Sequence, residues 1–310
     1  MRRLSRATAC LAAAAICAPA VAGESPVRAA ARLTISSRTR ALVVSPHPDD
    51  AVLGAAGVIA RIVARRGSVQ IVEMTSGDGF PKGVAAVRHA TRAPLTPESY
   101  RWYGSLRERE VSRAMQALGV TRSRVRLLGF PDEGLCDLAA DRAAATVFSS
   151  PYTHRDSPPP TERIDAGAKY RAADVKTELE ELLLAFRPTL VVLPGDSDLH
   201  PDHCATHMLA HDAAAAAESR GLRPPTFAHY VIHRAAGSGD AARATTLTLT
   251  AAERSAKTRA IEAYRSQTAV MADFMRSFER PDETFVIGDR ETPAPCWCSG
   301  RNIAPPSRAQ

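Results

Sequence analysis

The chain has 310 residues, with 40 Lys and Arg against 33 Asp and Glu, and aromatic residues make up only 5% of it. The net charge of +7 is mild and is not gathered into a basic block, which argues against a nucleic-acid-binding or membrane-surface protein. The length suits one large domain with a full hydrophobic core, and no internal repeat indicates a solenoid.

Residues 1–22 have the pattern of a secretory signal peptide. Arg2, Arg3 and Arg6 precede an alanine-rich apolar stretch, and "AVA" at 20–22 provides a small-residue cleavage site. No later segment approaches the roughly 20 apolar residues of a membrane span. We therefore expect residues 23–310 to form a single exported domain, periplasmic or extracellular, with a proline-bearing C-terminal tail. A lipid anchor at Cys17 is the alternative.

The mature chain would keep four cysteines, Cys136, Cys204, Cys296 and Cys298. An even number in an exported protein permits two disulfides, but four cysteines allow three pairings and the sequence does not choose among them. The "CWC" at 296–298 lacks further ligands at zinc-finger spacing, so a structural zinc is not expected there.

In chain order, buried-strand patterns alternate with helical patterns. The expected strands are 41–45, 69–75, 125–130 and 189–194. A helical pattern ending at Gly67 lies between the first two, a capping box at Ser105–Glu108 opens the helix before the third, and another helical pattern precedes the fourth. This alternation predicts an α/β fold with a doubly wound, mostly parallel sheet and helices on both faces, and with ligands at the carboxyl ends of the strands.

Two long segments, 76–104 and 131–172, show few periodic signals and are rich in Pro, Ser and Gly. Loops of such length in a compact domain are commonly functional, so we expect both to wall the site. Towards the C-terminus, "TLTLT" at 246–250 alternates as a strand does, and a helix is expected from about Thr250 through "KTRAIEAYRSQ".

Two His- and Asp-rich clusters follow two of the expected strands. "HPDD" comes after 41–45, where one aspartate would serve as a helix N-cap but His47 and the second aspartate would remain unexplained. "GDSDLHPDH" comes after 189–194 and carries His200 and His203. Because parallel strands end at the same edge of a sheet, the two clusters can converge on one point.

Together these motifs resemble the PIG-L/LmbE-like family of zinc-dependent N-acetylglucosaminyl deacetylases, which has a Rossmann-like fold. The likeness extends from about Leu42 to His207 and includes "LGFPDEGL" at 128–135. It implies removal of an N-acetyl group from an acetamido sugar or glycoconjugate. Ala51 departs from the glutamate that often follows the two aspartates, which puts support of the ligands by their neighbours in question.

The resemblance also implies a role for each motif residue. It implies zinc ligands at His47, Asp50 and His203, a general base at Asp49 and a transition-state-stabilising histidine at His200. Arg107 and Asp132 match positions that contact the sugar, although Asp132 also suits a plain turn after Pro131.

These residue types suit amide hydrolysis on physical grounds as well. Two imidazoles and one carboxylate give zinc three protein ligands and leave a position for water, as in catalytic sites. Asp49 would accept the proton of that water, and a protonated His200 would stabilise the oxyanion. We expect one Zn²⁺ per chain, with Fe²⁺ as an alternative metal.

The other histidines have ordinary interpretations. His207 and His211 follow His203 at intervals of four residues, which would also suit a metal site on one helix face, but no acid lies at a suitable spacing and we expect surface or core positions. His89, His154, His229 and His233 lie outside any motif.

Other functions remain open at this point: a metal-dependent amidase for another amide, a metallophosphoesterase with two metals, or a non-catalytic carbohydrate-binding relative. An unpaired acid at Asp49 would argue against the last of these. The sequence names neither the sugar nor the oligomeric state.

Overall fold

The computed structural model describes residues 33–89, 94–140, 147–234 and 244–288. The expected signal peptide, the C-terminal tail, Cys296 and Cys298 lie outside this part. Among the described helices, none combines the length and the apolar character needed to cross a membrane.

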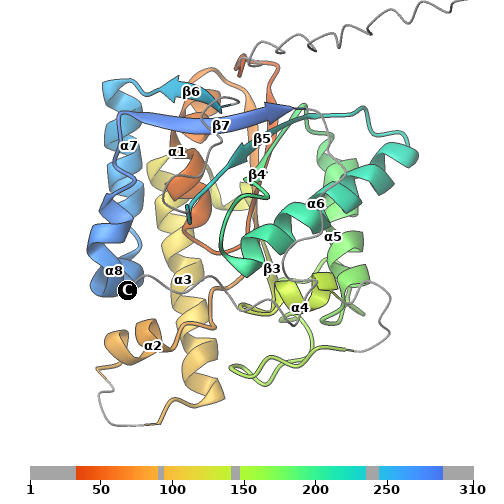
Figure 1. The fold of residues 1–310 in the computed structure, drawn as a ribbon, viewed down its shortest axis with the longest axis vertical. Coiled ribbons are helices and arrows are strands. Elements are labelled where there is room, and N and C mark those ends of the chain that lie inside the picture. Colours follow the sequence, from red (N-terminus) through yellow and green to blue (C-terminus); the bar gives the residue numbers. More distant parts are fainter. Residues whose placement is uncertain (1–32, 90–93, 141–146, 235–243, 289–310) are drawn as a thin grey trace, which may run out of the picture.

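A seven-stranded sheet runs through the middle of the protein in the order β3-β2-β1-β4-β5-β7-β6 (Figure 1). Five strands are parallel: β1 (Arg40–Ser45), β2 (Ser68–Thr75), β3 (Val125–Phe130), β4 (Leu190–Pro194) and β5 (Thr226–Tyr230). The last two, β6 (Ala244–Thr248) and β7 (Asp282–Gly288), run antiparallel to their neighbours. The α/β prediction is confirmed, and the first four strands lie within one residue of their expected positions.

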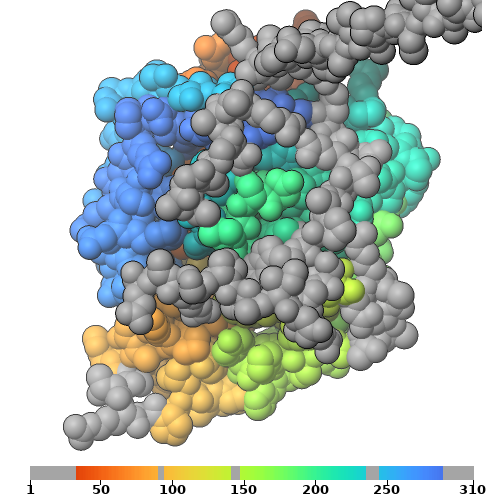
Figure 2. All heavy atoms as spheres, in the orientation of Figure 1, coloured from red at the N-terminus to blue at the C-terminus, as the bar shows by residue number. Residues whose placement is uncertain are grey.

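Helices cover both faces of this sheet. Alternate residues of β1 point to opposite sides, so that Ala41 and Val43 pack in one core and Leu42 and Val44 in the other. The first core is covered by α1 (Asp50–Ala64), α3 (Pro97–Ala117), α7 (Ala251–Glu262) and α8 (Arg265–Arg276). The second is covered by α4 (Leu135–Ala140), α5 (Ala172–Phe186) and α6 (Pro201–Ser219). Figure 2 shows α7 and α8 in blue on one flank and the orange segment of α2 (Pro81–Val87) and α3 beneath them.

The helix before β3 begins earlier in the chain than the sequence pattern predicts. The structure forms its capping box at Thr96 and Ser99, and each side chain accepts a hydrogen bond from the backbone N–H of the other residue. Ser105 instead lies inside α3, where its hydroxyl donates to the Arg101 carbonyl. The prediction of a helix start at Ser105 was therefore wrong. A serine followed three residues later by a glutamate has the sequence of a capping box even when the serine lies inside a helix and bonds to the preceding turn.

The described parts of the two long segments contain helices that the sequence pattern does not indicate. The first contains α2 (Pro81–Val87) and the beginning of α3, and the second contains α4. The C-terminal helix starts after Thr250 as predicted, with a capping box to Glu253, but it breaks at Tyr264 into α7 and α8.

Strand order explains where the two motifs lie. β1 is flanked by β2 on one side and β4 on the other, so the direction in which strands are added reverses between β1 and β4. In open α/β sheets a crevice forms at this point, outside the carboxyl ends of the strands. "HPDD" follows β1 and "HPDH" follows β4, so the fold places both motifs at that crevice.

Candidate active site

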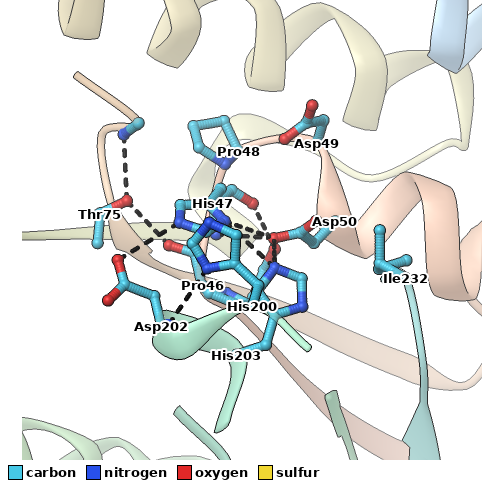
Figure 3. Close-up of polar contacts among 12 residues, drawn as sticks. Pro46, His47, Pro48, Asp49, Asp50, Thr75, His200, Asp202, His203 and Ile232 are labelled. Atoms are coloured by element: carbon cyan, nitrogen blue, oxygen red, sulfur yellow. Dashed lines mark hydrogen bonds and ion pairs between the residues drawn. The ribbon is translucent and has the colours of Figure 1, made fainter. Parts of the chain in front are cut away.

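His47, Asp50 and His203 bring three ligand atoms to one point. Asp50 Oδ2 lies 3.0 Å from His47 Nδ1 and 3.0 Å from His203 Nε2, and the two nitrogens are 3.3 Å apart. Zinc bound at about 2.0–2.1 Å from each of three tetrahedral ligands needs them roughly 3.3 Å from one another. The three residues are at most 8% exposed. Figure 3 shows Asp50 pointing toward the two imidazoles.

Neighbouring carboxylates fix both histidine rings in the orientation that a metal requires. His203 Nδ1–H donates to Asp198 Oδ2 at 3.0 Å, which leaves the Nε2 lone pair directed at the site. His47 Nε2 lies 3.2 Å from Asp132 Oδ1 and 3.5 Å from Asp202 Oδ2, so its Nδ1 is left as the ligand atom. Metal-ligating histidines typically make this second hydrogen bond to a carboxylate.

The electrostatics of the cluster favour a bound cation. Burial alone would lower the pKa of His47, but hydrogen bonds to Asp132, Asp202 and Asp50 hold it well above its ordinary value. Burial would likewise lower the pKa of His203, yet the charges of Asp50 and Asp198 raise it to about 9. Burial would raise the pKa of Asp50, and the adjoining His203 keeps it well below its usual range instead. The carboxylates that raise these two histidine pKa values would equally stabilise a divalent metal ion in place of the imidazole protons, so the donor set fits such an ion.

Asp49 is paired with an arginine, contrary to expectation. It occupies the N-cap position of α1, but its side chain makes no capping bond, and its Oδ1 accepts from Arg107 Nη2 at 2.7 Å. In Figure 3 Asp49 lies apart from the histidine cluster, beyond Pro48, and no dashed line joins it to that cluster. Burial raises the pKa of Asp49 and the nearby Arg107 charge partly opposes that rise. The interpretation of Asp49 as an unpaired acid was wrong, because α3 brings Arg107 to it from 58 residues away.

Arg107 is itself buried, at 4% exposure, and is held in two directions. Its Nη1 donates to the Gly77 carbonyl at 2.9 Å while Nη2 binds Asp49. A side chain at Gly77 would collide with the guanidinium, and Gly77 has a φ of +62° that favours glycine. This loop therefore fits around Arg107 only with glycine at that position.

His200 is oriented by the start of α6. It is the N-cap of α6, in the extended conformation expected before Pro201, and its Nδ1 accepts from the Asp202 backbone N–H at 3.2 Å. With Nδ1 used as an acceptor, the ring proton lies on Nε2. This orientation leaves Nε2, which lies 3.7 Å from Glu133 Oε1, as the donor available to a ligand in the cavity.

A cavity of about 640 Å³ opens above the cluster. Six of the seven site residues predicted from the sequence line it, and His203 lies beneath them, fully buried. The long segments contribute Gly79, Phe80, Lys82 and Glu133, which agrees with their expected role as walls. The cavity is wide enough for a sugar and carries both polar and apolar surface.

Several residues of this site were not predicted from the sequence. His233 was treated as ordinary, yet it lines the cavity and its ring centroid lies 5.3 Å from that of His200. Burial, followed by the His203 charge, lowers the pKa of His233 to about 4, so the ring is neutral. Asp198 and Asp202 were also not assigned a function, yet Asp198 contacts the His203 ring and Asp202 the His47 ring. Their spacing around "HPDH" was visible, but only the fold shows which nitrogen each one meets.

Comparisons with known proteins show to which family the chain is similar. Residues 42–214 match the family model PIG-L, described as GlcNAc-PI de-N-acetylase. The chain is 31% identical over 213 residues to a 1D-myo-inositol 2-acetamido-2-deoxy-alpha-D-glucopyranoside deacetylase of Mycobacterium sp. (strain KMS), a match that covers 65% of this chain and 57% of that protein. The chain thus matches little more than half the length of that relative.

Solved structures show the same fold. A conserved protein from Thermus thermophilus is 26% identical, with a TM-score of 0.51 and coverage of 80% of this chain and 94% of that one. The N,N'-diacetylchitobiose deacetylase from Pyrococcus horikoshii is 21% identical, with a TM-score of 0.52 and coverage of 80% and 83%. With the family model matched over more than half of the sequence and both of its His-Asp motifs in place, this chain belongs to the PIG-L family.

Proposed function

We propose that this protein is a zinc-dependent hydrolase that removes the acetyl group from an N-acetylated amino sugar or glycoconjugate. One observation carries the proposal: three ligand atoms from His47, Asp50 and His203 meet within 3.0–3.3 Å beneath a cavity lined by Asp49 and His200. These three residues would hold the metal. Zinc in such a site lowers the pKa of water toward 7 and polarises a carbonyl group.

Asp49 and His200 would then act on the substrate directly. Asp49 accepts the proton of the attacking water and delivers it to the nitrogen as the C–N bond breaks, which releases acetate and a free amine. The raised pKa of Asp49 suits such a base, since it holds a transferred proton better than an ordinary carboxylate does. His200 donates its Nε2–H to the carbonyl oxygen as negative charge develops there.

Arg107 and Asp132 serve these groups as well as the cavity. Arg107 holds Asp49 through a 2.7 Å hydrogen bond, and Asp132 orients His47 while also accepting from the Gly79 N–H. Both line the cavity, so a contact with sugar hydroxyls is part of the proposal. We infer that each couples the position of the substrate to the chemistry.

A two-metal phosphoesterase fits this geometry less well. Such sites place two ions about 3.5–4 Å apart, bridged by additional carboxylates. Here the additional acids are engaged: Asp198 binds His203 and backbone N–H groups, and Asp202 accepts from the Glu133 N–H. With both acids engaged in this way, the site fits a single ion better than a bridged pair.

The substrate class follows from where we propose the protein works. Its N-terminal pattern favours export, and Cys136 and Cys204 are both disulfide-bonded, which suits an oxidising compartment. An exported deacetylase would meet cell-envelope or extracellular glycans. The intact mass of the exported protein tests this: cleavage after residue 22 agrees with it, and an uncleaved chain retained in the cytoplasm contradicts it.

A screen of acetate release tests the activity. The purified protein would be offered a panel of N-acetylglucosaminyl glycosides and oligosaccharides, together with sugar phosphates. We expect acetate from at least one N-acetylated sugar and no phosphate release. Phosphate release without acetate would support the phosphoesterase instead.

A further inference from the structure

Three further histidines form a buried cluster outside the cavity. His207 and His211 lie one turn apart on α6, and His229 lies on β5. These residues are 1%, 1% and 4% exposed, respectively, and none lines the cavity of the candidate active site. Histidine is seldom buried so completely, and three together call for a physical account.

The three rings face one another closely. Their centroids are 4.4 Å apart for His207 and His211, 5.0 Å for His207 and His229, and 5.3 Å for His211 and His229. One nitrogen from each ring lies within 4.8 Å of the other two, and Nε2 of His211 is 3.0 Å from Nε2 of His229. Two histidines at i and i+4 on a helix with a third from a neighbouring strand is a spacing that holds metals.

The surrounding residues orient these rings. His207 Nδ1–H donates to the Pro194 carbonyl at 3.0 Å, so its Nε2 keeps a lone pair. A backbone carbonyl on the second ring nitrogen is the usual companion of a metal-ligating histidine. His211 stacks on Phe227, with centroids 4.4 Å apart, and Phe227 lies two residues before His229 on the same face of β5.

We propose that His207, His211 and His229 form a second metal site, which takes a borderline transition-metal ion such as Zn²⁺. Three imidazoles suit zinc, copper, nickel or cobalt, whereas magnesium and calcium prefer oxygen ligands. Zinc needs its ligands roughly 3.3 Å apart. The three ligand atoms lie within 4.8 Å of one another, so the widest separation would have to shorten by up to about 1.5 Å, through rotation of the rings about their soft χ2 angles.

This site would act on structure. It joins α6 to β5, and the first turn of α6 carries His203 while His200 caps it. A metal held there would fix the helix that supplies one ligand of the candidate active site to the sheet. The competing explanation is a core hydrogen bond between two neutral imidazoles, with one nitrogen donating to the other, and it requires no metal.

The test separates the two sites by substitution. The background is the full mature chain carrying His47→Ala and Asp50→Ala, which removes two ligands of the first site. This protein would be stripped with a chelator, loaded with Zn²⁺, desalted and analysed for zinc per chain. His211→Gln and His229→Gln would each be added to the background, and His154→Asn would serve as an exposed-histidine control, since asparagine tolerates the positive φ at that position.

We expect about one zinc per background chain, at least tenfold less in either glutamine variant, and no change in the His154→Asn control. Loading with Co²⁺ should give visible absorption that disappears in the same variants. Circular dichroism establishes that each protein is folded.

A folded background chain that binds no zinc would overturn the proposal, as would full binding in both glutamine variants. In the chain with both sites intact, His211→Gln should lower the content from two ions to one. If the proposed zinc site at His47, Asp50 and His203 proves wrong, the zinc content of the background protein should not change. The proposed function and this second site can therefore be disproved independently.

Discussion

At the residue scale, the two adjacent aspartates of "HPDD" have different surroundings. Asp50 points into the cluster and contacts both histidine ligands at 3.0 Å, whereas Asp49 turns toward Arg107. The backbone turn that separates them is held by Ser45, whose hydroxyl donates to the His47 carbonyl and accepts from the Ala51 N–H. Neighbouring residues of one type can therefore divide ligation and proton transfer between them.

Substitution of each aspartate by asparagine should separate these roles. Asp49→Asn keeps the size of the side chain but removes the base, so we expect a loss in turnover of roughly 100-fold or more with metal retained. Asp50→Asn removes the charge of a ligand, so metal content should fall. Turnover and metal analysis on the same samples provide the check. Equal metal loss in both variants would show that Asp49 is also a ligand.

The pH dependence of the reaction should respond to Arg107. Burial raises the pKa of Asp49, and the Arg107 charge holds that rise in check. Arg107→Gln removes this charge, so the pKa of Asp49 should rise further. Because Asp49 must be ionised to act as a base, kcat/KM should then fall away at a higher pH on the acid side.

Arg107→Lys is the matched control, because it keeps the positive charge but changes the geometry. We expect the acid limb of the kcat/KM profile to shift less in Arg107→Lys than in Arg107→Gln, relative to the unaltered protein. An acid limb that stays in place in Arg107→Gln would mean that another group limits the rate at low pH.

At the element scale, helix α5 forms hydrogen bonds to the second long segment, residues 131–172, through Glu178. Glu178 Oε1 accepts from the backbone N–H groups of Ile164 and Asp165 at 2.9 and 3.3 Å. Within the described part of the chain, its Oε2 is buried without a hydrogen-bond partner. Burial raises the pKa of Glu178 to about 7, so the carboxyl is protonated in mildly acidic solution.

This carboxyl should make stability depend on pH. The folded state holds the proton up to about pH 7, while the unfolded chain releases it near its ordinary value of 4.5, so the free energy of unfolding falls as pH rises between the two. Glu178→Gln keeps the acceptor and cannot ionise. We expect the variant to match the unaltered protein at pH 5 and to be more stable by about 2 kcal/mol at pH 8.

Denaturant unfolding at the two pH values measures the difference. Glu181→Gln, at an exposed position of the same helix, controls for a general loss of negative charge on α5. A variant that is equally destabilised at both pH values would show that Glu178 is ionised in the folded protein.

Some of these helices and strands could be predicted from the sequence and others could not. Four of the five parallel strands were predictable because buried strands form continuous apolar runs, and the meeting of the two His-Asp motifs was predictable because each motif follows one of these strands. The start of α3 was not, because Ser105 imitates a cap that Thr96 provides. Two features depend on packing between distant elements, which no local sequence pattern encodes. These are the pairing of Asp49 with Arg107 and the cluster of His207, His211 and His229.

At the scale of the whole molecule, the C-terminal segment completes the site. The Tyr264 hydroxyl, at the break between α7 and α8, donates to the Pro48 carbonyl at 2.6 Å, and Gln267, in the first turn of α8, lines the cavity. β7 adds Glu283, which accepts from the Gly57 N–H and pairs with Lys257. The site therefore depends on residues beyond the part that the family model matches.

The central claim is that a metal held by His47, Asp50 and His203 is required for the removal of acetyl groups. Acetate release by the chelator-stripped protein, measured before and after zinc is returned, tests it most directly. We predict that activity falls at least ~100-fold on stripping and returns with zinc, and that His203→Ala does not recover. Full activity in the stripped protein, confirmed to be free of metal, would contradict the account.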